Sequence, residues 1–201
     1  AKDILLTMQA CKTDTHNHYS GFVLPAIEPI DFYEIKTKLP LPPYLLGVLL
    51  GDGCLSDNSI SITNTDEHII SKCRDIIESL SHNLVTGSNH SYRIVKPINI
   101  RRHRGYPNKI KNIIEDLGLF GSHSETKFIP EIYKYSSVQE RYELMKGLMD
   151  TDGYVSKTGE IQYTTVSEKL CNDINFIIEN FRNYQFLISL INSIMIYAGG
   201  L

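Results

Sequence analysis

The sequence predicts an α+β fold made of two related halves, and three observations support this prediction. An apolar segment that ends in Asp-Gly occurs at residues 44–53 and again one hundred positions later, at residues 144–153. Each copy is followed by a short alternating strand pattern and then by an amphipathic helix pattern. The length, 201 residues, suits one large domain or two small ones. A repeated half-domain therefore organises the chain.

The two apolar segments are predicted helices, spanning residues 44–52 and 143–152. Each carries a glycine at the same depth, Gly47 and Gly147, which removes side chains at a point where two helix backbones can touch. We expect the helices to pack together at the centre of the molecule, with their C-terminal ends side by side. The glycine of each Asp-Gly pair is predicted to end its helix as a left-handed C-cap.

The remaining elements follow the same order in both halves. Short strands are predicted at residues 60–63 and 161–164, where apolar and polar residues alternate. Capped amphipathic helices are predicted next, over residues 65–80 and 167–181. The first half then continues with predicted strands near 83–87 and 91–101, and with a helix near 107–117 that ends at Gly118.

Composition excludes several classes of protein. Hydrophobic residues make up 42% and charged residues 21%, as in globular proteins. The net charge of −3 does not indicate nucleic-acid binding by the whole chain, although an average hides a local patch. Four separated cysteines without a C-x-x-C pair favour reduced thiols in an intracellular protein, cytoplasmic or organellar. No signal-peptide pattern and no apolar run of membrane-spanning length is present.

The first 43 residues read as an irregular lead-in. Prolines recur between Pro25 and Pro43, and proline disfavours helix. Cys11, His16 and His18 match no zinc-ligand spacing and are interpreted as polar loop residues. We therefore divide the chain into a lead-in (1–43), a first half-domain (44–137) and a second half-domain (138–201).

Asp52 and Asp152 are the main candidates for chemistry. If the two helices lie side by side, these carboxylates meet, and like charges at that distance are costly unless a cation lies between them. Hard oxygen ligands with open positions favour Mg²⁺, and such sites suit phosphodiester hydrolysis. The alternative is that Asp-Gly is only a turn after a core helix. The second copy, with its matching strand and helix, argues against that alternative.

Residues 45–53 (LLGVLLGDG) and 145–153 (MKGLMDTDG) resemble the two dodecapeptide motifs of LAGLIDADG homing endonucleases. Residues 127–130 (KFIP) resemble the lysine-x-x-proline block of intein-type members, and residues 24–32 resemble the stretch that joins a splicing domain to such an endonuclease. The resemblance covers residues 42–181. It implies half-domains of αββαββα type related by a pseudo-two-fold axis, with two central helices and saddle-shaped antiparallel sheets that bind DNA.

The resemblance also implies a function and a set of site residues. The function is Mg²⁺-dependent, site-specific cleavage of double-stranded DNA at a long target by a monomer. The resemblance is compatible with a precursor that has a splicing domain fused to this chain and with one that has none. The implied ligands of two or three shared metal ions are the carboxylates of Asp52 and Asp152 and the carbonyls of Gly51 and Thr151. The other implied catalytic residues are Lys127, beside the scissile phosphate, and Ser61 and Gln162, which would order water.

Lys127 also has a plain interpretation, a surface lysine at the edge of a linker. In the catalytic interpretation, the apolar residues after it pin the backbone beside the sheet of the first half. The ammonium would then lie near the scissile phosphate without binding the metal.

A basic stretch supports contact with DNA in the first half. Residues 87–114 contain no acidic side chain. The basic residues expected to reach phosphates or guanine edges are Arg93, Lys96, Arg101, Arg102, Arg104 and Lys109. The alternative is a solvated basic loop without a partner.

The sequence departs from the resemblance in two places. Leu50 stands in the first motif where the second has Asp150, at a position that is not the implied metal ligand. After Phe181, two strands, a helix and a second lysine are expected, but residues 185–201 are mostly apolar and contain no lysine. The second departure favours a different class of function: a non-cleaving nucleic-acid-binding protein, either an intron RNA maturase or a DNA-binding module. The two retained aspartates favour the enzyme.

Overall fold

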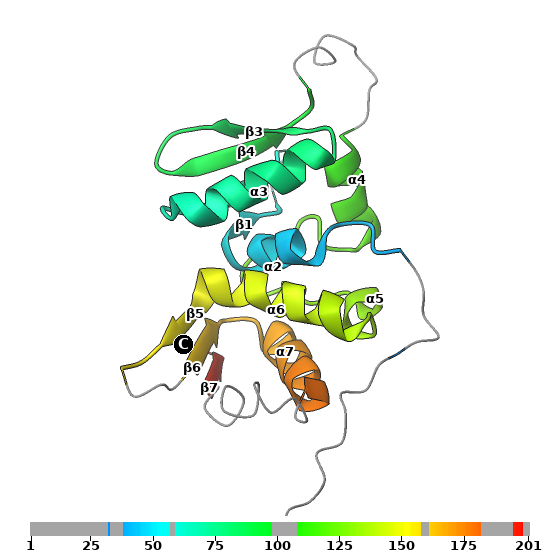
Figure 1. Cartoon of the computed structure of the whole chain (residues 1–201), viewed down its shortest axis with the longest axis vertical. Helices are drawn as coiled ribbons and strands as arrows, with labels where there is room; N and C mark the ends of the chain where they lie inside the picture. The colour runs from blue at the N-terminus through cyan, green and yellow to red at the C-terminus, as the bar shows by residue number, and fades with distance from the viewer. Residues whose placement is uncertain are drawn as a thin grey trace, which may run out of the picture.

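The computed structural model describes Phe32, residues 38–56, 59–97, 108–157 and 161–181, and the backbone of residues 195–198. Helices and strands alternate along the chain (Figure 1). The elements of the first part are α2 (Pro43–Asp52), β1 (Gly53–Cys54), β2 (Ser61–Thr63), α3 (Glu67–Ser79), β3 (Asn83–Thr86), β4 (Ser91–Val95) and α4 (Lys109–Asp116). The short helix α5 (Glu131–Lys134) follows at the end of the first half-domain, and the elements of the second are α6 (Val138–Asp152), β5 (Gly153–Val155), β6 (Ile161–Thr165), α7 (Glu168–Phe181) and β7 (Met195–Ala198).

The order of elements confirms the predicted α+β fold. The first half runs helix, two strands, helix, two strands, helix from α2 to α4. The second begins in the same way, with α6, β5, β6 and α7. Figure 1 shows α2 and α6 across the middle of the molecule, with the first sheet and α3 above them and the second sheet and α7 below.

The two sheets differ in one strand pairing. The first has the order β1-β2-β4-β3 and is antiparallel throughout. The second has the order β5-β6-β7, and β7 lies beside β6 as β4 lies beside β2, but runs parallel to it. The predicted antiparallel arrangement therefore does not extend to β7. A physical reason is that α7 comes between β6 and β7, and a crossover through a helix returns the chain in the parallel sense.

The central contact between α2 and α6 is made at the predicted glycines. A Cβ atom on Gly47 would collide with the carbonyl oxygen of Leu144, and one on Gly147 would collide with that of Tyr44. The two helix backbones therefore touch, and the C-terminal ends of α2 and α6 lie together.

The predicted left-handed C-caps are wrong. Gly53 has φ −82° and ψ 137°, and Gly153 has φ −84° and ψ 148°, so both are extended and begin the strands β1 and β5. What requires glycine here is space: a Cβ on Gly53 would lie 2.7 Å from the Cα of Leu49. Each helix thus passes directly into a strand without a separate turn.

Each described sheet has a buried face and an open face. Ile62, Tyr92 and Ile94 are buried on the side that carries the helices, while Arg93 is exposed on the other side. In β6, Ile161 and Tyr163 are buried and Thr164 is exposed. The predicted alternation is therefore confirmed, with β4 ending at Val95 rather than at residue 101.

Side chains cap the two outer helices, as the sequence predicts. Asp66 accepts a hydrogen bond from the backbone N–H of His68 at 2.8 Å at the start of α3. Ser167 accepts one from the N–H of Leu170 at 3.1 Å at the start of α7. Across the described ranges, the helices fall short of the length and apolar character that crossing a membrane requires.

Candidate active site

Asp52 and Asp152 come together because α2 and α6 end side by side. A Cβ on Gly51 would lie 3.1 Å from Oδ2 of Asp152, so the second carboxylate rests against the end of the first helix. Asp52 is half-buried, whereas Asp152 is exposed to solvent at the end of α6. Repulsion from Asp52 contributes to raising the pKa of Asp152, as expected for neighbouring carboxylates.

The pKa values of both carboxylates are raised above the ordinary value of an aspartate. Burial raises the pKa of Asp52 above its ordinary value, against the opposing effects of the Asn64 amide and the Lys127 ammonium. Desolvation and then Asp52 raise the pKa of Asp152, against Lys127 and the Tyr163 hydroxyl. A further cation at this position would relieve the cost of ionising both groups.

Asn64 and Tyr163 orient the two carboxylates. The Asn64 side chain donates to Oδ2 of Asp52 at 2.5 Å, and the Tyr163 hydroxyl lies 3.5 Å from Oδ2 of Asp152. Sequence reasoning missed both residues. The position of Asn64 in the chain was the available signal. Asn64 directly follows β2, and Ile62 of β2 pairs with Gly53, which is next to Asp52, so this register places Asn64 near that carboxylate.

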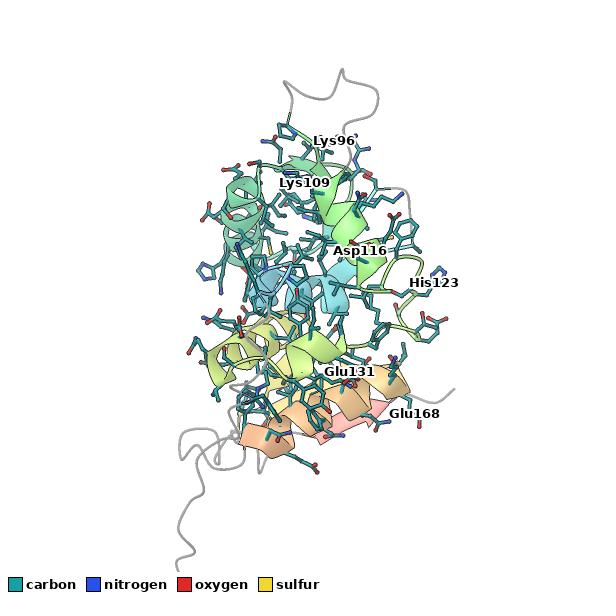
Figure 2. All side chains as sticks on the ribbon, turned by 90° about the vertical axis from the view of Figure 1, so that its right-hand side faces the viewer. Lys96, Lys109, Asp116, His123, Glu131 and Glu168 are labelled. Atoms are coloured by element: carbon teal, nitrogen blue, oxygen red, sulfur yellow. The ribbon has the colours of Figure 1, made fainter. Side chains whose placement is uncertain are left out.

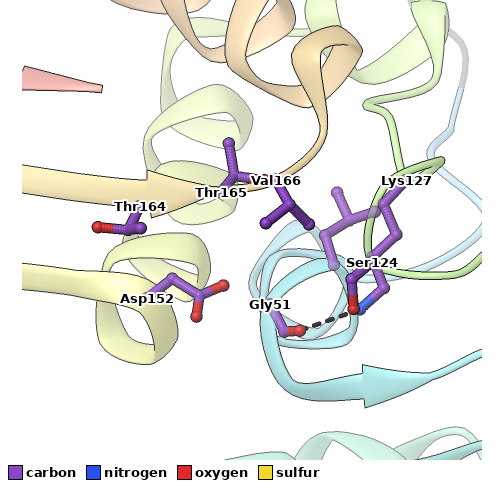
Figure 3. Close-up of a pocket in the computed structure, with 8 residues that line it drawn as sticks. Gly51, Ser124, Lys127, Asp152, Thr164, Thr165 and Val166 are labelled. Atoms are coloured by element: carbon purple, nitrogen blue, oxygen red, sulfur yellow. Dashed lines mark hydrogen bonds between the residues drawn. The ribbon is translucent and has the colours of Figure 1, made fainter. Parts of the chain in front are cut away.

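Lys127 is a buried ammonium at the end of α2. The residue is only 4% exposed, and its Nζ donates to the carbonyl of Gly51 at 2.9 Å (Figure 3). The same Nζ donates to the carbonyl of Gly53 at 2.8 Å. It thereby satisfies carbonyls that a helix end leaves without partners, and its charge complements the negative end of the helix dipole. Burial lowers the pKa of Lys127, while Asp152 and Asp52 act in the opposite direction.

The main-chain anchors of this lysine lie on the second half. The Ser167 hydroxyl donates to the carbonyl of Lys127 at 2.6 Å, and the N–H of Ile129 donates to Asp173 of α7 at 2.9 Å. The expectation that the block lies beside the first half's sheet therefore holds only for the lysine side chain. Lys127 links the two halves at the site.

A pocket of about 250 Å³ opens between the lysine and Asp152 (Figure 3). Its lining comes from the end of α2, the segment before α5, the end of α6 and the end of β6: Leu50, Gly51, Ser124, Lys127, Asp152, Thr164, Thr165 and Val166. An ammonium, a carboxylate and hydroxyl groups thus line one small space, which suits a hydrated ion or a phosphate group.

The donor set fits a hard divalent ion. Among the residues that the structure describes, no group of three or more His, Cys, Asp or Glu side chains is placed to hold a metal. A metal here would therefore rest on Asp52, Asp152 and backbone oxygens, with positions left for water and substrate. The Gly51 carbonyl already accepts from Lys127 but keeps a second lone pair. The Thr151 hydroxyl donates to the Leu148 carbonyl at 2.8 Å, within its own helix.

Ser61 and Gln162 lie on the open faces of the two sheets. Ser61 of β2 pairs with Cys54 and Arg93, and Gln162 of β6 pairs with Tyr154. Cross-strand partners share a face, and Tyr154 is 59% exposed. Both polar residues are thus near the ends of α2 and α6. Within the described contacts, neither forms a hydrogen bond with Asp52 or Asp152.

The predicted DNA-binding residues are only partly placed. Arg93 is exposed on β4, on the same face as Ser61. Lys96 directly follows β4 and Lys109 begins α4, both at the end of the molecule formed by the first half (Figure 2). Arg101, Arg102 and Arg104 lie outside the described residues.

Asp150, the other acidic residue of the second motif, points elsewhere. Its Oδ2 accepts a hydrogen bond from the Tyr44 hydroxyl at 2.8 Å. Burial and this hydrogen bond raise the pKa of Tyr44 well above its ordinary value. Asp150 therefore fastens the start of α2 to the end of α6.

Comparison with known proteins gives a family match over the second half. Residues 140–183 match the family model of the LAGLIDADG-like domain. This segment contains the second motif, β5, β6 and α7, so the match supports the LAGLIDADG family for the part of the chain that supplies Asp152.

Similar segments also occur in larger proteins. The chain is 28% identical over 134 residues to a replicative DNA helicase DnaB of Mycobacterium intracellulare, covering 67% of this chain and 18% of that protein. It is 27% identical over 143 residues to the RNA polymerase subunit Rpo1C of Methanocaldococcus jannaschii, covering 71% and 16%. It is 26% identical over 145 residues to a DnaB of Synechocystis, covering 67% and 17%. The chain thus spans less than a fifth of the length of these relatives.

Proposed function

We propose that this chain is a metal-dependent, site-specific DNA endonuclease of the LAGLIDADG type, associated with an intein. The observation that carries the proposal is the meeting of Asp52 and Asp152 at the ends of two glycine-packed helices, beside the buried ammonium of Lys127. Two neighbouring carboxylates, backbone oxygens and a buried ammonium suit phosphodiester hydrolysis better than binding alone.

Each residue of the site would have a separate task. When bound, Mg²⁺ would supply Lewis-acid activation of water and charge stabilisation at the leaving oxygen. Asp52 and Asp152 would hold the ions, with Asn64 fixing the orientation of the first carboxylate. Lys127 would hold the Gly51 carbonyl in place and offset negative charge that develops at the phosphate. Ser61 and Gln162 would order water from the open faces of the sheets.

The open face of the first sheet is the proposed DNA contact. Arg93 shares this face with Ser61, so a duplex that reaches the aspartates would also pass the arginine. Backbone contacts from Arg93, Lys96 and Lys109 would position the duplex without reading its sequence. Arg101, Arg102 and Arg104 would extend the same basic stretch.

The relatives support association with an intein. A helicase and an RNA polymerase subunit have different activities, yet each contains a segment similar to this chain in less than a fifth of its length. A segment shared in this way is expected of an element that inserts into unrelated host genes. We therefore expect the DNA target to be a host gene that lacks the insertion.

Incubation with a randomised library of long DNA duplexes, in Mg²⁺ and separately in EDTA, tests the proposal. Sequencing of the cut ends should give one dominant site, cleaved on both strands only when Mg²⁺ is present. Binding to a defined DNA without cleavage in Mg²⁺ would support the DNA-binding module instead. Selective binding of structured RNA without DNA cleavage would support the maturase.

A further inference from the structure

We propose that the described parts of the lead-in, Phe32 and residues 38–42, form a strap that is held by the layer of α5, α6 and α7, with Phe32 as its anchor. The receptor for Phe32 consists of Tyr135, Arg141, Phe176 and Phe181, contributed by α6, α7 and the residue that follows α5. The inference concerns how the chain before α2 is held, and it stands whether or not the protein cuts DNA.

Arg141 is the centre of the receptor. Its side chain is 0% exposed, which is rare for an arginine. Its guanidinium carbon lies 5.0 Å from the centroid of the Phe32 ring and 5.3 Å from that of Phe181. A cation within about 6 Å of an aromatic face is attracted to it, and more strongly when both are out of water. Arg141 therefore joins the lead-in to the last turn of α7.

Two aromatic contacts extend the receptor. The rings of Phe32 and Tyr135 meet edge to face, with centroids 5.0 Å apart and an interplanar angle of 87°. Tyr135 in turn meets Phe176 of α7 at 5.3 Å and 68°. Such pairs contribute beyond simple burial. Phe32 thus begins a continuous row of rings that ends on α7.

A second attachment lies nearer to α2. The N–H of Leu41 donates to the Tyr133 hydroxyl at 3.0 Å, and the same hydroxyl donates to the carbonyl of Leu41 at 2.9 Å. Leu41 and Tyr133 are both fully buried. The lead-in is therefore fixed at two points to the layer of α5, α6 and α7, although it precedes the first half in sequence.

The α5 segment itself is tied to α7. Lys134 forms an ion pair with Asp173 at 2.9 Å, and Asp173 also accepts from the N–H of Ile129 at 2.9 Å. The strap therefore contacts a surface in which the α5 segment and α7 are already joined by an ion pair and a hydrogen bond. Leu41 of this strap is thus part of the buried core that lies between α2 and α5.

Hydrogen exchange on the full chain tests the strap with two variants. In Phe32→Ala, amide exchange in α7 should rise at least tenfold, while α3 of the first half stays within twofold of wild type. Phe32→Leu keeps apolar volume but removes the ring, and should show most of the same increase. Phe120→Ala is the matched control, because Lys111 lies 4.4 Å from the Phe120 ring in the first half. It should not raise exchange in α7 selectively.

A double-mutant cycle gives an independent readout. The combined effect of Phe32→Ala and Arg141→Met on the unfolding equilibrium constant should be about threefold or more smaller than the product of the two single effects. The reason is that each single substitution already removes the contact between the two side chains. Additive effects, or α7 exchange that rises no more than α3 exchange in Phe32→Ala, would overturn the proposal. If Arg141→Met does not fold, the exchange patterns of the two Phe32 variants decide.

Discussion

The Lys127 side chain has a structural task, and we propose that it also has a chemical one. Its ammonium satisfies the carbonyls of Gly51 and Gly53, and it is also the cation beside both aspartates. A lysine that only supports the helix end and one that also acts on the phosphate differ in their kinetics. Stability and cleavage must therefore be measured on the same variant.

Replacing Lys127 by Met should change both properties. Two carbonyls lose their charged donor, so we expect the free energy of unfolding to fall by about 1–3 kcal/mol. The single-turnover cleavage rate should fall by roughly ten- to a thousandfold, while DNA affinity changes little. Lys111→Met, on α4 away from the site, is the control. A folded Lys127→Met protein that cuts at the full rate would remove this residue from the chemistry.

The Cys73 thiol gives a pH signature of the core. Burial raises its pKa to about 12 from an ordinary value of 9.0, and Cys73 is fully buried on α3. The folded state therefore holds this proton more tightly than the unfolded state. The resulting stability is present below pH 9 and is lost as the pH rises from about 9 towards 12.

Urea unfolding between pH 8 and pH 11 measures this effect. The wild-type protein should lose stability more steeply with pH than Cys73→Val, in which the titrating thiol is absent. The difference between the two slopes isolates Cys73 from the buried tyrosines, which also titrate at high pH. Parallel curves for the two proteins would show that the thiol is not buried in solution.

The repeat marked Asp52 and Asp152, whereas Lys127, Ser61 and Gln162 were predicted only from the family resemblance. Asp52 and Asp152 correspond by position in two copies of one pattern, so their proximity followed from helix packing. Asn64 and Tyr163 carry no such mark, because their contacts with the aspartates depend on the register of β2 and β6. The Lys127 contacts with Gly51 and Gly53 span more than seventy residues and needed the fold itself.

At the scale of elements, the packing of α2 on α6 decides whether the site exists. The backbones touch at Gly47 and Gly147, where a Cβ would meet carbonyl oxygens that belong to the partner helix. Backbone atoms cannot turn aside as a flexible side chain can. Any added side chain must therefore push the helices apart.

Gly47→Ala and Gly147→Ala should each destabilise the protein by about 1–3 kcal/mol, as overpacking of a tight core does. Separation of the helices should also move Asp52 from Asp152 and lower cleavage. Lys146→Ala tests the same kind of change on an exposed position of α6 and should have little effect on stability. Denaturant unfolding and single-turnover cleavage provide the two readouts. Unchanged stability in both glycine variants would contradict the close contact.

Periodicity predicted the helices and strands but not how they join. The one-sided apolar spacing of α3 and α7 placed these helices to within a few residues, and the continuous apolar run placed α2. The helix predicted at 143–152 begins five residues earlier, at Val138. The prediction of left-handed caps was wrong because the sequence Asp-Gly is the same in two situations. Glycine can be required for a positive φ, or it can be required because a Cβ atom would not fit. The parallel pairing of β7 was also beyond the sequence pattern, since hydrophobic residues do not encode strand direction.

At the scale of the whole molecule, charge is distributed unevenly. The chain carries −3 overall, yet Arg93 lies exposed on the open face of the first sheet. Arg93→Ala should weaken DNA binding and reduce the slope of log K against log salt by about one unit, as the loss of one phosphate contact does. Lys169→Ala, on α7, should leave the slope unchanged. An unchanged slope in Arg93→Ala would place the duplex elsewhere.

The division into halves was predictable from the repeat, whereas the role of the lead-in was not. Most of the lead-in lies outside the described residues, but the contact of Phe32 with Arg141 joins residues more than one hundred positions apart. No local pattern marks such a contact. The same limit applies to the pocket, whose walls come from four separate parts of the chain.

The central claim is that Asp52 and Asp152 together serve cleavage, and a comparison within one motif tests it most directly. Single-turnover cleavage of a cognate DNA in Mg²⁺ should be abolished in Asp52→Asn and in Asp152→Asn, with DNA affinity largely kept, because these carboxylates act in the transition state. Asp150→Asn is the matched control: Asp150 accepts the Tyr44 hydroxyl and should retain cleavage. Wild-type cleavage rates in either Asp52→Asn or Asp152→Asn would contradict the account.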